Sequence, residues 1–415
     1  MSKTSSTDLS PYAPLKLREF QFFIAGRFIY IMAIRMVGAV IGWWMYKLTG
    51  SKLALGFVGL SEVIPALSFA LYAGHKIDLG ERKRMLLICV GAYAICCVSL
   101  LYLSSKMVAN QYHHYTIAGL ICVTIALTGV IRAFSGPIFS AMISQVVPRP
   151  MLANAAAISS AGWLVASIFG HAIGGFCIAW LGIHYTFSVV IILVVFTFFL
   201  FSKLYPKPPF LKESKSAWKS VKEGIVYVYK TKELFGAATL DLFAVLFGGA
   251  VALLPVFAMD ILHISPIGFG WLNAATDIGS ILMVSFLTLK PLKGKQGTIL
   301  FFAVAGYGLC IIIFALSKVF WLSFFALLLS GCMDGVSVII RNTILQLKTP
   351  DELRGRVASV NSMFINSSNE LGQFESGVAA KLIGTVPAVV FGGCMTIAVA
   401  ITTWFKAPAL RKMEY

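Results

Sequence analysis

The sequence is poor in charged residues, and poorest in acidic ones. Charged side chains make up 12% of its 415 residues, and only 17 are Asp or Glu against 34 Lys or Arg. Soluble domains carry about a quarter charged residues. Hydrophobic residues reach 58%, and the mean hydropathy is +0.85. This composition excludes an ordinary soluble domain and predicts a membrane protein.

The sequence also lacks the patterns of a metal site or a disulfide framework. All eight cysteines lie inside apolar runs, without metal-ligand spacing and without a loop partner, so we expect free, buried thiols. Motifs of a membrane-embedded enzyme, such as aspartate-rich pairs or His-Glu-x-x-His, are missing too. We therefore expect a protein that is not an enzyme and that holds no metal or other cofactor. A membrane-embedded enzyme is the less favoured alternative from another functional class.

Long apolar runs are what the sequence has in abundance. A membrane-spanning helix needs about 20 residues to cross a hydrocarbon core of about 30 Å. Twelve runs are long enough, near residues 20–47, 54–73, 85–104, 115–146, 151–181, 183–202, 234–261, 266–289, 297–317, 320–347, 353–383 and 386–405. We predict an all-α membrane protein with twelve transmembrane helices.

The basic residues predict how these helices are oriented. If the chain starts in the cytoplasm, 25 of the 34 Lys and Arg residues fall in cytoplasmic segments, five fall outside and four lie within spans. Such a bias is typical of cytoplasmic loops. We therefore predict a multi-pass protein of the plasma (inner) membrane with both termini cytoplasmic. Anionic lipids of the inner leaflet favour the same bias, so the net charge of +17 needs no nucleic-acid partner.

One long polar segment, residues 203–233, divides the chain into two halves. Within it Trp218, Val221, Ile225 and Val228 recur at three- and four-residue spacing, as in an amphipathic helix on the membrane surface. The segment is either a simple linker at the membrane interface or a regulatory or partner-binding site, and the sequence does not decide between these two interpretations. The segment separates a six-helix bundle at 20–202 from a second at 234–405, with cytoplasmic tails at 1–19 and 406–415.

The two halves repeat each other weakly. Proline and glycine positions in the fifth predicted helix recur 202 residues later, at the start of and within the eleventh: Pro148, Gly170, Gly175 and Gly182 match Pro350, Gly372, Gly377 and Gly384. Parallel repeats about an axis normal to the membrane are a known transporter design. The repeat therefore favours two pseudo-symmetric bundles.

A charged segment, residues 74–84, stands between the second and third apolar runs and is expected to be a loop. Gly74, Asp78, Arg82 and Lys83 in it resemble the cytoplasmic loop 2–3 signature of the major facilitator superfamily. Segments 48–56 and 350–357 are similar to the enterobactin-exporter-like branch of that family. The resemblance implies two pseudo-symmetric six-helix bundles, transport by alternating access, and a gating role for these four residues.

The resemblance implies secondary transport and favours export, but it says little about the substrate. We expect export of a small amphipathic molecule, drug-like or siderophore-like, by proton antiport through a monomer in the lipid bilayer. A proton gradient would drive it in place of a cofactor. The alternative is a transporter of the same fold for a lysophospholipid or another solute.

Ionisable residues inside the spans carry whatever chemistry the membrane part performs. A charge there costs at least ~3 kcal/mol on insertion scales, so each should face a cavity or a partner. The third, sixth, ninth and twelfth predicted helices hold none, and we expect them to face lipid. The others hold Arg27, Arg35, Glu62, Arg132, Asp241, Asp277, Asp334, Arg341, Glu370 and Glu375.

Four carboxylates are candidates for carrying the proton: Glu62 and Glu370 first, then Asp241 and Asp277. The affinity of a carboxylate for a proton rises with burial and falls beside an arginine, so alternating access can load and unload it. A structural ion pair is the alternative for each. Arg35 and Glu62 are expected at similar depth on neighbouring helices.

Residues expected to line the substrate cavity are the remaining charges of the spans and the amides of the eleventh helix. The amides either contact substrate or hydrogen-bond between helices. Asp334 and Arg341, seven residues apart, share one helix face. The cavity set is Arg27, Arg35, Arg132, Asp334, Arg341, Asn366, Asn369, Gln373 and Glu375.

Overall fold

The structure, a computed structural model, describes residues 10–207, 217–290, 292, 294–350 and 353–414. Helices of the first half are η1 (Ala13–Lys16), α1 (Arg18–Thr49), α2 (Lys52–Leu79), α3 (Arg82–Leu103), α4 (Lys106–Gln111), α5 (His114–Val146), η2 (Arg149–Met151) and α6 (Leu152–Ser202). Those of the second half are α7 (Ala217–Lys230), α8 (Lys232–Phe247), η3 (Ala250–Leu253), α9 (Leu254–Val256), η4 (Phe257–Ile261), α10 (Pro266–Leu289), α11 (Gln296–Leu316), α12 (Phe320–Lys348), α13 (Arg354–Ile383), α14 (Thr385–Lys406) and α15 (Pro408–Arg411).

The helices account for the twelve predicted spans. In the described residues, ten stretches are long and apolar enough to cross a membrane. One of them contains α6, which turns back on itself at Gly182, where φ is 79° and ψ is 170°. A positive φ is accessible to glycine at little cost, so α6 supplies two spans. The twelfth is α13, which is more polar than the rest.

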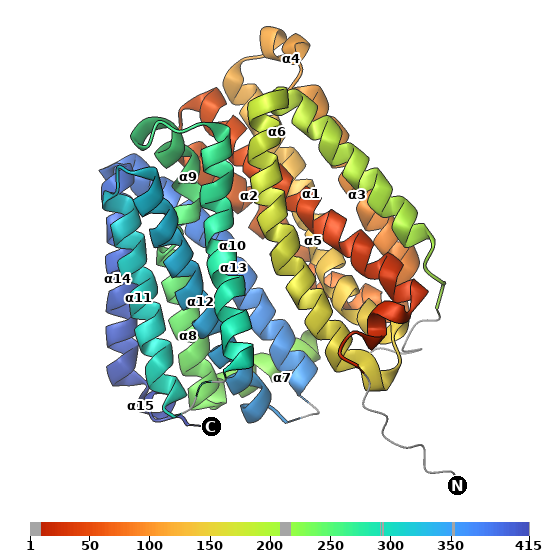
Figure 1. Cartoon of the computed structure of the whole chain (residues 1–415), viewed down its shortest axis with the longest axis vertical. Helices are drawn as coiled ribbons and strands as arrows, with labels where there is room; N and C mark the ends of the chain where they lie inside the picture. Colours follow the sequence, from red (N-terminus) through yellow and green to blue (C-terminus); the bar gives the residue numbers. More distant parts are fainter. Residues whose placement is uncertain (1–9, 208–216, 291, 293, 351–352, 415) are drawn as a thin grey trace.

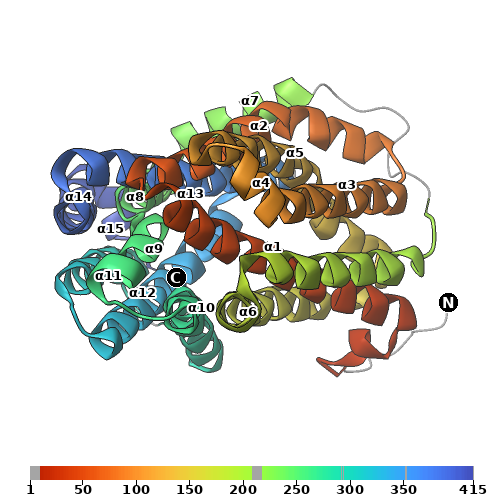
Figure 2. The ribbon, with the colours of Figure 1, turned by 90° about the horizontal axis from the view of Figure 1, so that it is seen from above.

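The spans form two bundles side by side, α1 to α6 in one and α8 to α14 in the other (Figure 1). No strand occurs in the described part of the chain. The halves meet along two helix pairs, α2 with α13 and α6 with α10 (Figure 2). The predicted fold class is confirmed.

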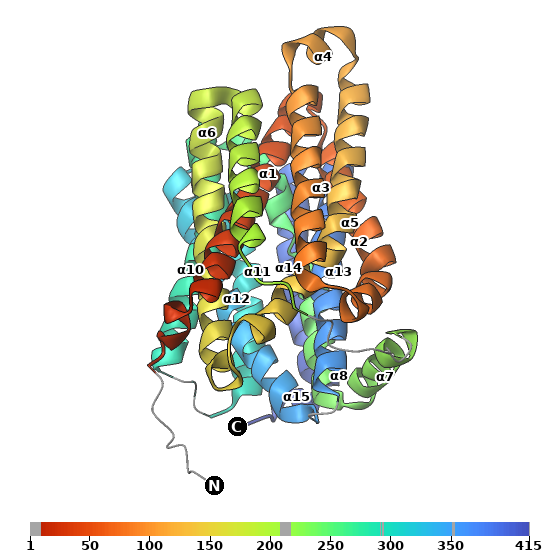
Figure 3. The ribbon, with the colours of Figure 1, turned by 90° about the vertical axis from the view of Figure 1, so that its right-hand side faces the viewer.

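The start of α1 and the end of α14 lie at one end of the molecule, which we name the termini end; the opposite end is the far end (Figure 3). Side chains exposed on α3, the second arm of α6, α11 and α14 include Ile95, Ile192, Phe302 and Phe405. These are the four helices without ionisable residues in their apolar spans. Their exposed apolar surface suits contact with lipid.

Two predicted elements differ from the structure. The predicted loop 74–84 is helical almost throughout, because α2 continues to Leu79 and only Gly80 and Glu81 separate it from α3. The predicted helix 234–261 is broken after Phe247, since Gly248 and Gly249 precede a 3₁₀ turn. Proline then follows at 255, in α9, and a π-helical turn ends the span.

Helix α7 lies within the predicted linker, at the termini end beside α13 and α2 (Figure 3). Glu223 forms an ion pair with Arg356, and the Tyr227 hydroxyl donates to the Lys348 carbonyl oxygen at 2.6 Å. These contacts fix α7 to the second half. Val228 is buried, whereas Ile225, predicted on the same apolar face, is exposed. The side chains of Trp218 and Val221 lie outside the described part.

Candidate functional site

The two halves touch at the far end through paired glycines. A Cβ atom on Gly377 of α13 would lie 2.8 Å from the Cα atom of Gly56 of α2. A Cβ atom on Gly175 of α6 would lie 2.8 Å from the Cα atom of Gly270 of α10. Small residues of this kind let helix backbones approach closely in membranes. Both interfaces are therefore closed near the far end.

Side chains reinforce this closure. The Tyr46 hydroxyl of α1 hydrogen-bonds the Asp260 carboxylate of η4, and the rings of Trp43 and Phe269 lie 5.2 Å apart. Beside them is a hollow of about 360 Å³ that both halves line, with Trp43, Lys47, Ile178, Gly182, Ile183, Met259 and Pro266. All these contacts join the first half to the second.

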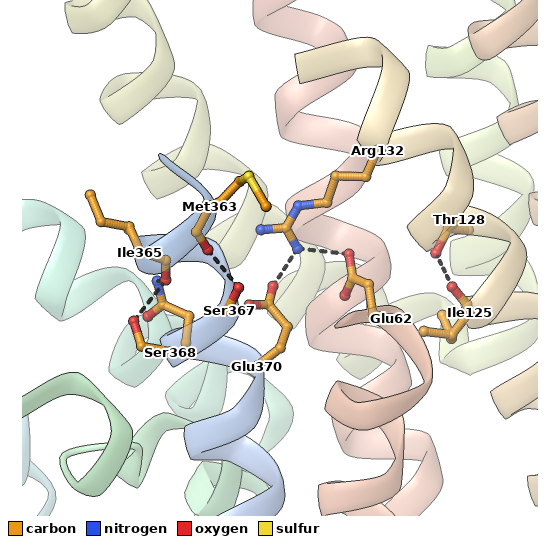
Figure 4. A network of polar contacts seen from close by, with 10 residues as sticks. Glu62, Ile125, Thr128, Arg132, Met363, Ile365, Ser367, Ser368 and Glu370 are labelled. Carbon is orange, nitrogen blue, oxygen red and sulfur yellow. Dashed lines mark hydrogen bonds and ion pairs between the residues drawn. The ribbon is translucent and has the colours of Figure 1, made fainter. Parts of the chain in front are cut away.

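At mid-depth Arg132 joins two carboxylates from opposite halves (Figure 4). Its Nη1 atom lies 2.8 Å from Oε1 of Glu62 and also contacts Oε1 of Glu370. Glu62 lies on α2 and Arg132 on α5, both in the first half, while Glu370 lies on α13. We name these three residues the arginine cluster. With both carboxylates ionised it carries a net charge of −1.

Exposure differs sharply within the arginine cluster. The Arg132 side chain is 42% exposed and Glu62 27%, but Glu370 only 7%. The second carboxylate oxygen of Glu370, Oε2, is buried without a hydrogen-bond partner. Leaving a buried acceptor unsatisfied costs about 1 to 3 kcal/mol. In the described part of the chain, Arg132 is the cation that contacts this carboxylate.

Glycines again explain why these helices meet here. A Cβ atom on Gly59 of α2 would lie 2.9 Å from the Glu370 carbonyl oxygen. On α5, a Cβ atom on Gly129 would collide with the backbone of Glu62. Only glycine at both positions brings α2 into contact with α13 on one side and α5 on the other. The three side chains then converge.

A second charged group lies wholly in the second half. Arg341 of α12 forms an ion pair with Asp241 of α8. It forms a second, at 3.7 Å, with Asp334, which lies seven residues earlier on the same face of α12. Its Nε atom also donates to the Ser337 hydroxyl at 3.1 Å. The Asp334 side chain is 45% exposed, against 9% for Asp241. This group holds α8 against α12 and leaves Asp334 accessible.

A third group joins the halves between α6 and α10. The Asp277 carboxylate accepts a 2.7 Å hydrogen bond from Ser167 and lies 3.0 Å from Nδ1 of His171. Arg35 of α1 lies beside this group, because its guanidinium carbon is 4.9 Å above the Trp163 ring and a Cβ atom on Gly170 would lie 2.6 Å from its Cβ atom. We name Asp277, Ser167 and His171 the histidine cluster.

The partners of two predicted residues differ from what the sequence favoured. Arg35 lies over Trp163, beside the histidine cluster, and the arginine that meets Glu62 is Arg132. Neither Ser167 nor His171 is among the candidates predicted from the sequence. Only the contact of α6 with α10 shows that His171 faces an aspartate.

Other predicted cavity residues have local contacts. The guanidinium of Arg27 lies 5.6 Å above the Phe139 ring, and its Nε atom is buried without a hydrogen bond. Asn369 donates to the Ile365 carbonyl oxygen at 3.0 Å. A Cβ atom on Gly59 would lie 2.9 Å from the Gln373 Cβ atom, and Glu375 is half-buried. The Asn366 side chain lies outside the described residues.

The predicted gating residues surround the turn between α2 and α3. Arg82 is buried and donates to the Ala141 carbonyl oxygen at 3.1 Å, and Lys83 donates to that of Ser202 at 2.9 Å. Both bonds fasten the start of α3 to other helices of the first half. Gly74 lies inside α2, and the side chain of Asp78 is outside the described part.

Comparison with known proteins places this geometry in context. A sequence model described as Major Facilitator Superfamily matches residues 23–373. The chain is 25% identical to the enterobactin exporter EntS of Shigella flexneri over 343 residues, which cover 81% of this chain and 79% of that protein. It is 25% identical to the multidrug efflux pump Tap of Mycolicibacterium fortuitum over 362 residues, 82% of this chain and 84% of that one. The crystal structure of a D-xylose-proton symporter superposes with a TM-score of 0.72 at 12% identity, covering 97% of this chain and 100% of that one.

Proposed function

Because this chain belongs to the major facilitator superfamily, and is thus a multi-pass membrane transporter, we propose that it exports a small amphipathic molecule in exchange for protons. The arginine cluster is the proposed proton site. The exporters among its relatives support the direction, and they support a drug-like or siderophore-like substrate. A lysophospholipid or another solute is the alternative cargo for the same fold.

One observation carries the proposal: a single guanidinium holds two carboxylates that come from opposite halves. One proton on either carboxylate makes the cluster neutral, because one carboxylate and the arginine then balance. Glu370 is the better acceptor, since it is the more buried and its Oε2 atom lacks a donor. Glu62 can keep Arg132 paired while Glu370 is protonated.

Protonation of Glu370 then changes how the halves are joined. Charge-assisted hydrogen bonds are roughly twice as strong as neutral ones. A protonated Glu370 therefore weakens the link between α13 and α5, while Glu62 and Arg132 stay together within the first half. Proton binding at this position favours separation of α2 from α13 at the far end. A ligand shifts the equilibrium between joined and separated halves only if it binds the two states with different affinity. The proton does so here, because Glu370 contacts Arg132 only in the joined state.

The proposal also includes the membrane location, the orientation and the oligomeric state of the protein. We place the protein in the plasma (inner) membrane with the termini end cytoplasmic, which the basic residues of that end support. The proton gradient replaces a cofactor, and a monomer contains the whole arginine cluster. Orientation is tested with one engineered cysteine, Lys215→Cys, and an impermeant thiol reagent on intact cells. Labelling from outside contradicts the placement.

The proton site is tested in proteoliposomes with matched variants. Glu370→Gln and Glu62→Gln keep side-chain size and remove the titration. Glu233→Gln is the control, because it also breaks an acid–base pair, with Lys348, but within one half. Ethidium, a common drug-efflux probe, is the transported reporter, and substrate-dependent proton flux is recorded beside binding at equilibrium.

We expect Glu370→Gln to lower proton-driven flux by about 100-fold or more while ethidium binding changes little. Glu62→Gln should lower flux less, and Glu233→Gln should keep it. Full proton-driven flux in both cluster variants contradicts the assignment and moves attention to Asp241 and Asp277. Parallel loss of binding, flux and thermal stability in Glu370→Gln identifies a structural ion pair instead.

A further inference from the structure

Two arginines of α1 stand apart from the charged clusters. Among the described residues, Arg27 and Arg35 form no ion pair, whereas the arginines of α5 and α12 each contact two carboxylates. Each instead lies over an aromatic ring, Arg27 over Phe139 and Arg35 over Trp163. A guanidinium at membrane depth is costly without a matching charge or water. A bound anionic ligand would supply that charge.

Charges of the spans are distributed unequally between the halves. Away from the ends of the spans, the first half holds three arginines and the single carboxylate Glu62, while the second holds five carboxylates and the single arginine Arg341. Complementary potentials orient a charged ligand more than they bind it. An anionic group entering between the halves is therefore drawn to the first half.

Arg35 is better placed than Arg27 to receive that anion. The neighbouring carboxylate, Asp277, is already bound by Ser167 and His171 and, in the described part of the chain, forms no ion pair with Arg35. A guanidinium stacked on an indole keeps its N–H edges free, and its planar fork matches a carboxylate or phosphate. The ring beside it offers a surface for an apolar or aromatic body.

We propose that Arg35 and Trp163 bind the anionic group, carboxylate or phosphate, of an aromatic or amphipathic substrate. This rests on the proposed transport function and names its substrate class. Because Asp277 repels the same anion, the two charges act in opposite directions. Removing Arg35 must weaken anion binding, and removing the charge of Asp277 must strengthen it.

The experiment measures binding to the full-length protein in phosphatidylcholine nanodiscs by isothermal titration. Three probes share one aromatic body: 2-naphthoate, 2-naphthyl phosphate and the neutral 2-naphthamide. Arg35→Gln, Asp277→Asn and Arg27→Gln are compared with the parent, and a cooperative thermal transition with monodisperse elution confirms that each variant is folded. A parallel set of nanodiscs contains phosphatidylglycerol.

We expect the parent to bind an anionic probe about tenfold more tightly than the amide, the difference typical of a charge-assisted contact. Arg35→Gln should abolish that preference, Asp277→Asn should tighten naphthoate binding about threefold, and Arg27→Gln should change it by less than about threefold. Weaker naphthoate binding in phosphatidylglycerol shows that a lipid headgroup reaches the site. Unchanged binding there assigns the site to a soluble anion.

Three results overturn the proposal: equal affinity of the parent for the amide and both anions, an anion preference that survives Arg35→Gln, or equal losses in Arg27→Gln and Arg35→Gln. The last result would reflect the general field of α1. Since binding is measured without a proton gradient, Glu370→Gln should retain it. Failure of proton coupling and failure of anion recognition are therefore separate outcomes.

Discussion

The two interfaces between the halves are built alike but charged differently. Each has a glycine pair near the far end, Gly56 with Gly377 and Gly175 with Gly270. Each also has an acid at mid-depth from the second half, Glu370 of α13 or Asp277 of α10. The partner of that acid is an arginine in one interface, and a histidine with a serine in the other.

Under the proposed function, this difference separates a charge switch from a packing contact. In the arginine cluster one permanent cation faces two acids, so a proton on Glu370 would weaken the link of α5 to α13. In the histidine cluster Asp277 keeps a neutral hydrogen bond from Ser167 whatever its other partner does. The interface of α2 with α13 should therefore respond to protons, and the interface of α6 with α10 should serve as the steadier contact.

Removing the cation should give the largest effect. Arg132→Gln leaves Glu62 facing Glu370, and losing a fully buried ion partner costs about 3 to 5 kcal/mol. We expect about 2 to 3 kcal/mol, because 42% of the Arg132 side chain is exposed. The matched change His171→Gln keeps a hydrogen-bond donor toward Asp277 and should cost about 1 kcal/mol. Thermal midpoints in one detergent test the order, and an equal or larger loss for His171→Gln would erase the distinction.

Glycine replacement tests the packing side of the comparison. A Cβ atom on Gly175 would lie 2.6 Å from the Pro266 carbonyl oxygen, whereas the nearest atom to one on Gly56 is the Phe374 carbonyl oxygen at 3.1 Å. Gly175→Ala should therefore cost about 1 to 3 kcal/mol and Gly56→Ala less. Thermal midpoints and thiol labelling at the far end measure both. Greater damage from Gly56→Ala would show that α6 and α10 separate more readily than the geometry suggests.

The smallest effect on stability is expected at the termini end of α2. Its sequence carries Asp78, whereas the stretch that follows α10, residues 290–296, holds no acid. Asp78→Asn should slow transport several-fold and leave the thermal midpoint nearly unchanged, because the loop signature implies a role in one of two helix arrangements. Transport equal to the parent would reduce residues 74–84 to a topology anchor.

The sequence predicted the number and type of helices because apolar length decides both. It also indicated the ionisable residues of the spans, since charges there are too costly to be incidental, and their roles in transport stay predictions. The ion-pair partners of these residues could not be predicted. The spacing of residues along the sequence does not show how each helix is rotated or which helices lie beside it. The sequence favoured Arg35 as the neighbour of Glu62, and only the contact of α5 with α2 shows that the arginine there is Arg132.

The two wrong element predictions, the loop at 74–84 and the unbroken helix at 234–261, each have a physical reason. Charges at residues 75–84 suggested a loop, yet Lys76 and its neighbours continue α2, and Gly80 ends it. Charged residues outside the hydrocarbon do not stop a helix. In the seventh span apolar length concealed the break, although Gly248, Gly249 and Pro255 were visible in the sequence. Turn chemistry should have outweighed hydropathy there.

The central claim is that the proton on Glu370 sets the distance between α2 and α13. Spin labels at Lys52→Cys and Lys381→Cys, near the far ends of these helices in a background without the native cysteines, report that distance without any substrate. The account predicts that labels lie close at high pH and separate as the pH falls, and that Glu370→Gln keeps them apart at every pH while Glu233→Gln follows the parent. A pH-dependent distance that persists in Glu370→Gln, or labels that stay close in that variant, would contradict it.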